Sequence, residues 1–456
     1  MKTKIIILLS FILISGMAFS QPPKDNTMLE IGVGVIDVSG ENAVILDPLH
    51  VRAVVFRQGP EQFAIVECET GALSKDVTIP AREKAALQTG IPFNNIIVAA
   101  THTHKSYPHK DFLPAIVQAV VDAKASLKPV KFKSSLGLQY NVSFNRRYYM
   151  KNGSVVFNPM FLNPDIVRPA GPFDPEVGIV MFYDAAKNVP VSCLLNFALH
   201  LDIVGDEGAA GQPNSISADY PYWIEKSLRN DFGNNFNSVF LTGSCGNINH
   251  WDFSKPGPQR GHETKSKQVG DSLYNSIKRA LPLAKEEVPS LATRYRVINI
   301  PVQSYTAEDL AWAKGVQGSS MSGKSEVPDE RQQFLNKVRK NRILTLDKLK
   351  QEGKVTLPID IQVFRLSDNT AVVTLPGEPF VEHGLAIKNF SPFDNTMIVE
   401  LASYNISDNS LTYIPNKKAY KQGEYEVENS ILAPGGGEIL VESIVKMLKE
   451  LKEDVK

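Results

Sequence analysis

The sequence predicts an α/β fold in which a mixed β-sheet core is flanked by helices. Two observations carry this prediction. Short apolar runs alternate with helical patterns between residues 53 and 127, and a second alternation of this kind begins at residue 359. Strands that alternate with helices indicate a sheet that is at least partly parallel. Because no internal repeat or low-complexity linker divides the 456 residues, we expect one large domain over residues 21–456.

The N-terminal third supplies the first predicted elements. We place Pro80 in the first turn of its helix, where the missing N–H does no harm. Apolar runs predict strands at Ile31–Val38, Ala53–Phe56, Phe63–Val66 and Asn95–Ala100, and helical patterns cover Pro80–Gln88 and Pro114–Leu127.

The rest of the chain predicts extended segments, two long loops and a charged insertion. Residues 129–195 are extended segments separated by turns, and residues 204–217 and 243–261 have loop composition. Residues 306–352 are charged and helical, without an apolar run long enough for a core strand, so we expect a helical insertion on the surface. The other predicted elements are strands at Ser238–Thr242, Ile359–Leu366 and Ala371–Leu375, and helices at Tyr220–Asn230, Glu378–Lys388 and Gly437–Lys452.

The first twenty residues have the pattern of a cleavable signal peptide. Lys2 and Lys4 precede an apolar run, and the small residues Ala18 and Ser20 mark its end. The run is shorter than the roughly 20 residues that span a bilayer. No cysteine follows it that could carry a lipid anchor. We expect an exported protein, periplasmic or secreted, with no transmembrane segment after signal removal.

Charge and cysteine content argue against two classes of protein. Lys plus Arg and Asp plus Glu both number 49, so no basic excess drives binding to nucleic acid. The three cysteines are too few for a disulfide framework, and none has the close spacing of a thiolate metal site. We expect Cys68 and Cys193 in the core, and we assign no catalytic role to them or to Cys245.

His102 and His104 are the strongest candidates for a functional site. They follow the predicted strand that ends at Ala100, and residues i and i+2 of a strand face the same side. The carboxyl ends of strands are also where open α/β sheets place their sites. Two such histidines can bind one metal ion, or divide the work between ligand and proton carrier. The alternative is a pair of surface or hydrogen-bonded histidines.

The other candidate residues are weaker when each is taken alone. His200 ends an apolar strand-like run and could be a structural histidine. Glu378 follows a strand that breaks at a Pro-Gly pair, and it could be an ordinary first-turn acid favoured by the helix dipole. Tyr413 and Tyr425 lie in a loop, where aromatic side chains usually serve packing. Spacing therefore supports a metal site without fixing its ligands.

Seven segments of the chain form a pattern when they are taken in order. They are Ala100-Thr-His-Thr-His104, Phe144-Asn-Arg-Arg147, Asn196-Phe-Ala-Leu-His200, Ser217-Ala-Asp-Tyr-Pro221, Gly246-Asn-Ile-Asn249, Pro376-Gly-Glu-Pro-Phe380 and the stretch from Tyr413 to Tyr425. In this order they resemble the neutral ceramidase family and its bacterial relatives. No single segment is decisive, but together they extend over about residues 30 to 450, which implies a single catalytic domain of the neutral ceramidase type. We expect this domain without the C-terminal β-domain that ceramidases carry.

The resemblance implies a zinc-dependent hydrolase. The family pattern places zinc on His102, His200, Glu378 and Tyr413. Zinc lowers the pKa of a bound water towards about 7 and polarises a carbonyl group, so the implied nucleophile is a zinc-activated water.

The resemblance also implies three catalytic groups around the scissile carbonyl. Arg146 and Tyr425 would donate hydrogen bonds to the developing oxyanion. His104 would carry a proton to the leaving group. Arg147, which follows Arg146 directly, is expected to be a surface cation.

Several positions depart from the family or allow two roles. Asp219 matches a family acid and is expected either to orient a ligand histidine or to cap the following helix. Asn249 stands where ceramidases have a serine that can engage the substrate, so no serine nucleophile is available there. Lys105, His109 and His250 add polar groups where the family has other residues. We therefore expect a substrate more polar than ceramide.

Three functions are compatible with these residues. The first is a zinc-dependent hydrolase of an amide or ester bond in a small-molecule, lipid or glycan substrate. The second is a metal-dependent hydrolase or lyase acting on an acylated or uronic-acid glycan, and a lyase would leave an unsaturated product. The third is a non-catalytic binding protein of the same fold, which the presence of all four proposed ligands disfavours.

Overall fold

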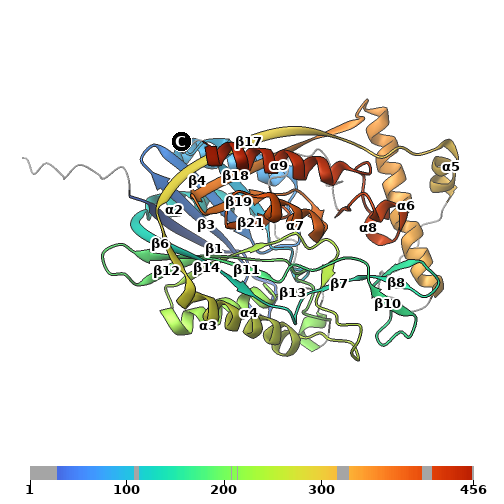
Figure 1. Cartoon of the computed structure of the whole chain (residues 1–456), viewed down its shortest axis with the longest axis horizontal. Helices are drawn as coiled ribbons and strands as arrows, with labels where there is room; N and C mark the ends of the chain where they lie inside the picture. The colour runs from blue at the N-terminus through green and yellow to red at the C-terminus, as the bar shows by residue number, and fades with distance from the viewer. Residues whose placement is uncertain are drawn as a thin grey trace, which may run out of the picture.

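The computed structural model describes residues 28–106, 112–206, 208–212, 214–315, 328–402 and 413–453. The predicted signal peptide and His109 lie outside these ranges. Within them the predicted α/β class is confirmed, because two mixed β-sheets are flanked by helices (Figure 1).

The larger sheet has nine strands among the described residues. Their order is β14-β12-β11-β6-β1-β3-β4-β5, and β16 pairs with β6 beside this path. Neighbouring strands are antiparallel except for β4–β5 and β12–β14, which are parallel. The strands are β1 (Glu30–Asp37), β3 (His50–Gln58), β4 (Glu61–Cys68), β5 (Ile96–Ala100), β6 (Lys128–Leu138), β11 (Glu176–Asp184), β12 (Pro190–Phe197), β14 (Asn237–Thr242) and β16 (Lys285–Glu287).

A smaller sheet packs against the inner face of the larger one. Its order is β17-β18-β19-β21, with β19 and β21 parallel. The core between the sheets takes Phe63 and Phe182 from the larger sheet and Phe364 and Met397 from the smaller one. The rings of Phe63 and Phe364 meet across it with their centres 4.5 Å apart. The strands are β17 (Pro289–Pro301), β18 (Thr356–Ser367), β19 (Thr370–Thr374) and β21 (Asn395–Val399).

Helices cover the outer faces of both sheets. In Figure 1, α7 and α9 lie over the smaller sheet, and α3 and α4 lie on the opposite side of the molecule. The close approach of α2 to β1 requires glycine, because a Cβ at Gly34 would lie 2.1 Å from the carbonyl oxygen of Ala119. The helices are α1 (Lys75–Thr89) and α2 (Phe112–Ala125) on β3 to β5, α3 (Tyr220–Phe232) and α4 (Lys267–Ala280) on β11, β12 and β14, and α7 (Val381–Phe390) and α9 (Gly436–Glu453) on the smaller sheet.

The insertion is formed by α5 (Ala307–Gly315) and α6 (Pro328–Gln351), which stand at the right of Figure 1 beside α8 (Tyr425–Glu428). We predict these helices on the surface, but α6 is partly internal. Leu346 and Leu349 are 3% and 1% exposed and join the core of the smaller sheet. The helix is therefore anchored at its C-terminal half, and its N-terminal half lies against α8.

Short ladders join the loops at one end of the sheets. They are β2 (Val44–Ile45) with β13 (Ser215–Ile216), β7 (Phe144–Asn145) with β15 (Ile248–Asn249), β20 (Glu378–Pro379) with β22 (Tyr413–Ile414), and β8 (Arg147–Met150) between β9 (Val155–Phe157) and β10 (Ile166–Pro169).

The carboxyl ends of several strands meet at one place. β5, β12, β19 and β21 each end one to four residues before His102, His200, Glu378 and Glu400, respectively. A backbone hydrogen bond of 2.9 Å from the nitrogen of Glu400 to the oxygen of Thr242 ties the end of β14 to this group. The candidate site therefore lies where the carboxyl ends of parallel strands converge.

Two local predictions are wrong. α1 begins at Lys75, so Pro80 lies inside the helix and not in its first turn. α7 begins at Val381 and not at Glu378, which also excludes the alternative role of Glu378 as a first-turn acid. Gly377 has a positive φ of 58°, and this turn places Glu378 in β20 instead.

None of the helices in the described ranges combines the length and apolar character that crossing a bilayer requires.

Candidate metal centre

His102 and His104 come together although neither lies in a strand. β5 ends at Ala100, and His102 has a φ of 73°, a left-handed conformation that is uncommon for a residue with a side chain. The two ring centres are 4.8 Å apart, and the Nε2 atoms are 3.4 Å apart. The backbone turn at His102, and not the alternation of a strand, produces the predicted proximity.

His200 is the third histidine at this point. Its ring centre lies 4.7 Å from that of His102 and 5.9 Å from that of His104. Ligand atoms of the three rings lie within 4.8 Å of one another, so the three could hold a metal ion. His102 and His200 are buried, with 9% and 1% exposure, whereas the side chain of His104 is exposed.

Glu378 faces the two buried histidines. Its Oε2 lies 3.3 Å from Nε2 of His102 and 3.2 Å from Nε2 of His200. Tyr413 is the register partner of Glu378 in the parallel pair of β20 and β22, and it is also buried. The structure thus gathers three of the proposed ligands around one point and places the fourth beside Glu378.

The hydrogen bonds of the two buried histidines prepare them to bind a cation. Nδ1 of His102 donates to the carbonyl of Gly71 at 2.6 Å, and Nδ1 of His200 donates to that of Cys245 at 2.8 Å. A carbonyl only accepts, so the proton of each neutral imidazole sits on Nδ1 and Nε2 presents a lone pair.

The Nε2 lone pairs of the two histidines are better placed to bind a metal ion than to interact with each other. Two nitrogen lone pairs and a carboxylate oxygen face the same point, where they repel unless a positive charge lies between them. Among the described residues, Nε2 of His200 and Oε2 of Glu378 are buried without a hydrogen-bond partner. Buried polar atoms rarely lack partners, and ligands of a cation are a recognised exception. The donor set of imidazole and carboxylate suits zinc.

Electrostatics at the centre follow from burial and from the carboxylate. Burial by itself would lower the pKa of His102, but Glu378 outweighs it and raises this pKa to about 9. Burial would raise the pKa of Glu378, yet His102 and His200 hold it well below its usual range. The pKa of His200 is lowered, mainly by burial. The carboxylate therefore attracts positive charge to this point, whether it arrives as a proton or as a metal ion.

Arg146 and Tyr425 stand beside the fourth proposed ligand. The guanidinium carbon of Arg146 lies 5.3 Å from the ring centre of Tyr413 and 5.9 Å from that of Tyr425. Its Nε donates to Glu426 at 2.9 Å, and Nη2 donates to the carbonyl of Gly246 at 2.7 Å. Burial opposes the charge on Arg146, but Tyr413 and Glu426 outweigh burial and raise its pKa well above the usual value. A cationic donor is therefore fixed next to the histidine cluster.

Arg147 is not the surface cation that we predict. It is 1% exposed, and its Nη1 donates to Oε2 of Glu426 at 2.6 Å. Glu426 thus binds the guanidinium groups of both neighbouring arginines. Two adjacent arginines give no signal in the sequence that a single buried carboxylate, 279 residues further along, will pair with both.

Two aromatic residues missed by the sequence analysis enclose Tyr425. The ring of Phe157 in β9 stacks on it with centres 5.1 Å apart, and that of Phe334 in α6 stacks on it at 5.3 Å. The charged insertion thus contributes an apolar side chain next to the candidate site. Its composition could not show this, because Phe334 lies in a segment in which charged and polar residues predominate.

Asp219 caps α3, which is one of its two predicted roles. Its Oδ1 accepts from the backbone nitrogen of Tyr220 at 2.7 Å and from Oγ of Ser266 at 2.8 Å. Its Oδ2 accepts from the backbone nitrogen of Ile203 at 2.8 Å. Asp219 therefore fixes the chain just after His200 rather than the histidine ring itself.

Asn249 is held by its neighbours. Its Nδ2 donates to Asn158 at 2.9 Å, and its Oδ1 accepts from the backbone nitrogen of Trp251 at 3.0 Å. His250 is buried and pairs with Asp202 at 3.1 Å.

The ammonium group of Lys105 is also engaged. It donates to Asp206 and to the carbonyl of Ala210, both at 2.6 Å. Lys105 thus ties the loop after the histidine pair to the loop that follows His200. The expectation of a more polar substrate loses support, because Lys105 and Asn249 make structural contacts.

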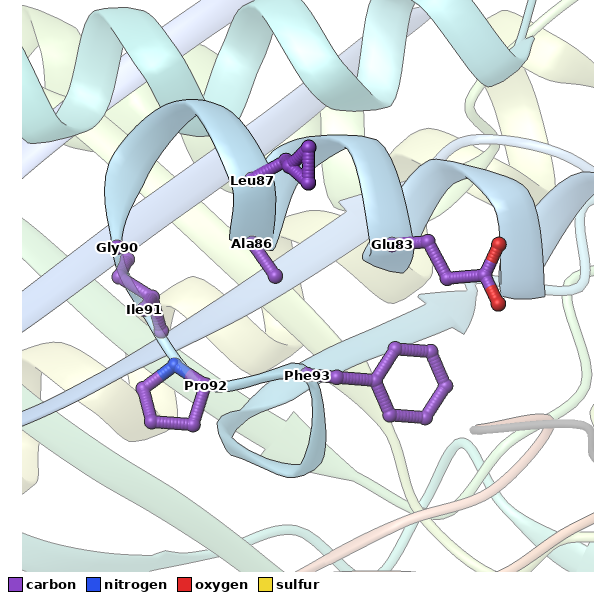
Figure 2. A pocket seen from close by; sticks show the side chains of 7 residues that line it. All are labelled: Glu83, Ala86, Leu87, Gly90, Ile91, Pro92 and Phe93. Atoms are coloured by element: carbon purple, nitrogen blue, oxygen red, sulfur yellow. The ribbon is translucent and has the colours of Figure 1, made fainter.

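An apolar surface groove lies away from this centre. Figure 2 shows it between the end of α1 and the 3₁₀ turn Phe93–Asn95, with Leu87 and Phe93 among its walls and Glu83 as its charged side chain. β5 starts immediately after this turn and leads to the histidines at its other end. The groove therefore belongs to the opposite edge of the sheet.

Comparison with known proteins finds similarity to neutral ceramidases. No family model matches the chain. A neutral ceramidase of Pseudomonas aeruginosa is 23% identical in an alignment of 325 residues, and the match covers 62% of this chain and 47% of that protein. The chain thus spans about half the length of this curated relative.

Solved structures extend the likeness to nearly the whole chain. The crystal structure of neutral ceramidase from Pseudomonas aeruginosa has a TM-score of 0.67 at 18% identity, and the match covers 94% of this chain and 75% of that one. A ceramidase complexed with C2 has a TM-score of 0.65 at 18% identity, with 94% and 76% covered. In sequence and in fold the chain is similar to neutral ceramidases. The resemblance predicted from the seven segments is confirmed, and at this identity the structures establish the fold.

Proposed function

We propose that this neutral ceramidase-like chain is a zinc-dependent hydrolase of an amide or ester bond. One observation supports the proposal above the others. Nε2 of His102 and Nε2 of His200 face Oε2 of Glu378 at 3.3 and 3.2 Å in a buried place, with the histidine protons held on the opposite ring nitrogens. This is a donor set arranged for a divalent cation.

We assign the roles of the side chains from their burial. His102, His200 and Glu378 would hold zinc, with Tyr413 as the fourth ligand. When bound, zinc polarises a carbonyl and makes water acidic enough to attack at neutral pH. His104 has the exposed side chain of the group, and we assign it the transfer of a proton to the leaving group.

Arg146 and Tyr425 would stabilise the negative charge that develops on the carbonyl oxygen. Arg146 is held by Glu426 and Gly246, so it would meet that charge without reorganising. The rings of Phe157 and Phe334 would form an apolar wall around Tyr425. This wall favours an acyl or other apolar group in the substrate, and the relatives that match are ceramidases. We therefore propose an N-acylated or O-acylated lipid or glycolipid as substrate, and export directed by residues 1–20.

The test combines metal content with product analysis. Purified protein should contain about one zinc per chain and should release fatty acid from ceramide or from a panel of N-acyl and O-acyl compounds. Chelation should abolish the release, and added zinc should restore it. The proposal fails if the folded protein binds no zinc, or if the zinc protein cleaves no acyl bond. An unsaturated product from a uronic-acid glycan would point to a lyase instead.

A further inference from the structure

A buried carboxylate outside the proposed ligand set is attached to the turn that carries His200. Glu400 follows β21, and its exposure is 0%. Oε2 accepts from the backbone nitrogen of Cys245 at 2.8 Å, and Oε1 accepts from the thiol of Cys245 at 2.9 Å. The carbonyl of the same Cys245 accepts from Nδ1 of His200. Glu400 thus holds the residue that orients the histidine ring.

The turn from Cys245 to Asn247 also contacts two other parts of the site. The nitrogen of Gly246 donates to the carbonyl of Pro379 at 3.0 Å, next to Glu378. The carbonyl of Gly246 accepts from Nη2 of Arg146, and the carbonyl of Asn247 accepts from the backbone nitrogen of Arg146 at 2.9 Å. This turn therefore connects His200, Arg146 and the strand of Glu378.

The packing at the turn leaves no room for a side chain at Gly246. A Cβ at Gly246 would lie 2.2 Å from the carbonyl oxygen of Glu378, so the two segments are in direct backbone contact. The backbone nitrogen of Glu400 is itself bonded to Thr242 at the end of β14. A small movement of the turn would therefore move a ligand histidine and the backbone of a ligand carboxylate together.

We propose that Glu400 is a positioning residue for the metal centre, which it acts on through Cys245 and His200. The proposal rests on the proposed zinc site. Groups that orient metal ligands typically change metal affinity by about 10-fold to 100-fold when they are removed. Glu400→Gln keeps the size of the side chain but replaces one acceptor oxygen with a donor, so Cys245 loses one of its two hydrogen bonds to this side chain.

Zinc itself is the probe, measured by competition with a chelator on the full chain. Glu400→Gln should weaken zinc binding by about 10-fold or more. The matched control is Glu287→Gln, since Glu287 is a buried carboxylate that binds Ser367 and Thr370 at the other end of β19. The control should keep the zinc affinity of the wild type within about twofold, even where its thermal stability falls.

A cobalt-substituted sample supplies a second measurement. Its visible absorption bands report the geometry of the ligands, so they should change in Glu400→Gln and stay as in the wild type in Glu287→Gln. If Glu400→Gln does not fold, the pair Cys245→Ser and Cys245→Ala replaces it. Serine keeps a donor for Oε1 and should retain the affinity better than alanine.

The outcomes separate this proposal from the proposed function. A wild-type protein that binds no zinc would contradict the function. A wild-type protein that binds zinc, with unchanged affinity and cobalt spectrum in folded Glu400→Gln, would overturn the role of Glu400 alone. Equal affinities for Cys245→Ser and Cys245→Ala would do the same in the replacement test.

Discussion

The pairing of Glu426 with two arginines gives the most quantitative prediction. Glu426 is 0% exposed, and it accepts from Arg146 at 2.9 Å and from Arg147 at 2.6 Å. Glu426→Gln removes the negative charge and leaves two buried guanidinium groups without it. Breaking a buried ion pair in this way costs about 3 to 5 kcal/mol of folding free energy. With an unfolding entropy of about 2.1 cal/mol/K per residue, a chain of this size should lose about 3 to 5 °C in Tm.

The same change should lower catalysis, because glutamine offers one acceptor oxygen and no charge to two guanidinium groups, so Arg146 is held less firmly. Removal of a well-placed donor to an oxyanion typically lowers kcat by about 10²-fold to 10³-fold. Asp360→Asn is the matched control, since Asp360 is 1% exposed and pairs with Arg82 at 3.1 Å on strand β18. It should lower Tm, measured by calorimetry, and leave kcat unchanged. A Glu426→Gln enzyme with lowered Tm and wild-type kcat would refute the assigned role of Arg146.

Three further predictions concern individual side chains. His104→Ala should keep one zinc per chain while kcat falls by about 10²-fold to 10⁴-fold, as elemental analysis and turnover measurements would show; loss of the zinc would make His104 a ligand instead. Phe334→Ala should raise KM for acyl substrates by about 2-fold to 10-fold, since one aromatic stack is worth about 0.5 to 1.5 kcal/mol, and an unchanged KM would exclude Phe334 from the substrate wall. Burial raises the pKa of Cys68, Cys193 and Cys245 well above the usual value, so a thiol reagent at pH 8 should label none of them in the native protein and all three after denaturation. Labelling of the native protein would contradict the packing around them.

The elements that the sequence predicts well are those with strong local patterns. Ile96–Ala100 is a continuous apolar run, and its burial in β5 follows directly. The final helix is also found close to its predicted bounds, because α9 has apolar residues at helical spacing. Pro80 is misplaced because the preceding residues Lys75 to Ile79 lack an apolar stripe, although the chain is already helical there.

The geometry of the site was harder to predict from the sequence, because backbone contacts between distant segments create it. His102 and His104 are close through a left-handed residue that no spacing rule predicts. Tyr413 lies beside Glu378 because β20 pairs with β22, a contact between segments 35 residues apart. Motif resemblance could nominate these residues since it compares whole patterns. It could not reveal Glu400 or Glu426, whose importance lies in the turns and guanidinium groups that they hold.

The most direct test of the metal centre is a crystal structure of the zinc-loaded protein with anomalous data at the zinc edge. We expect one strong peak, with Nε2 of His102, Nε2 of His200 and an oxygen of Glu378 at about 2.0 to 2.2 Å from it. The hydroxyl of Tyr413 should complete the set, and His104 should remain outside bonding distance. A peak elsewhere, or no peak in crystals that contain stoichiometric zinc, would contradict the assignment.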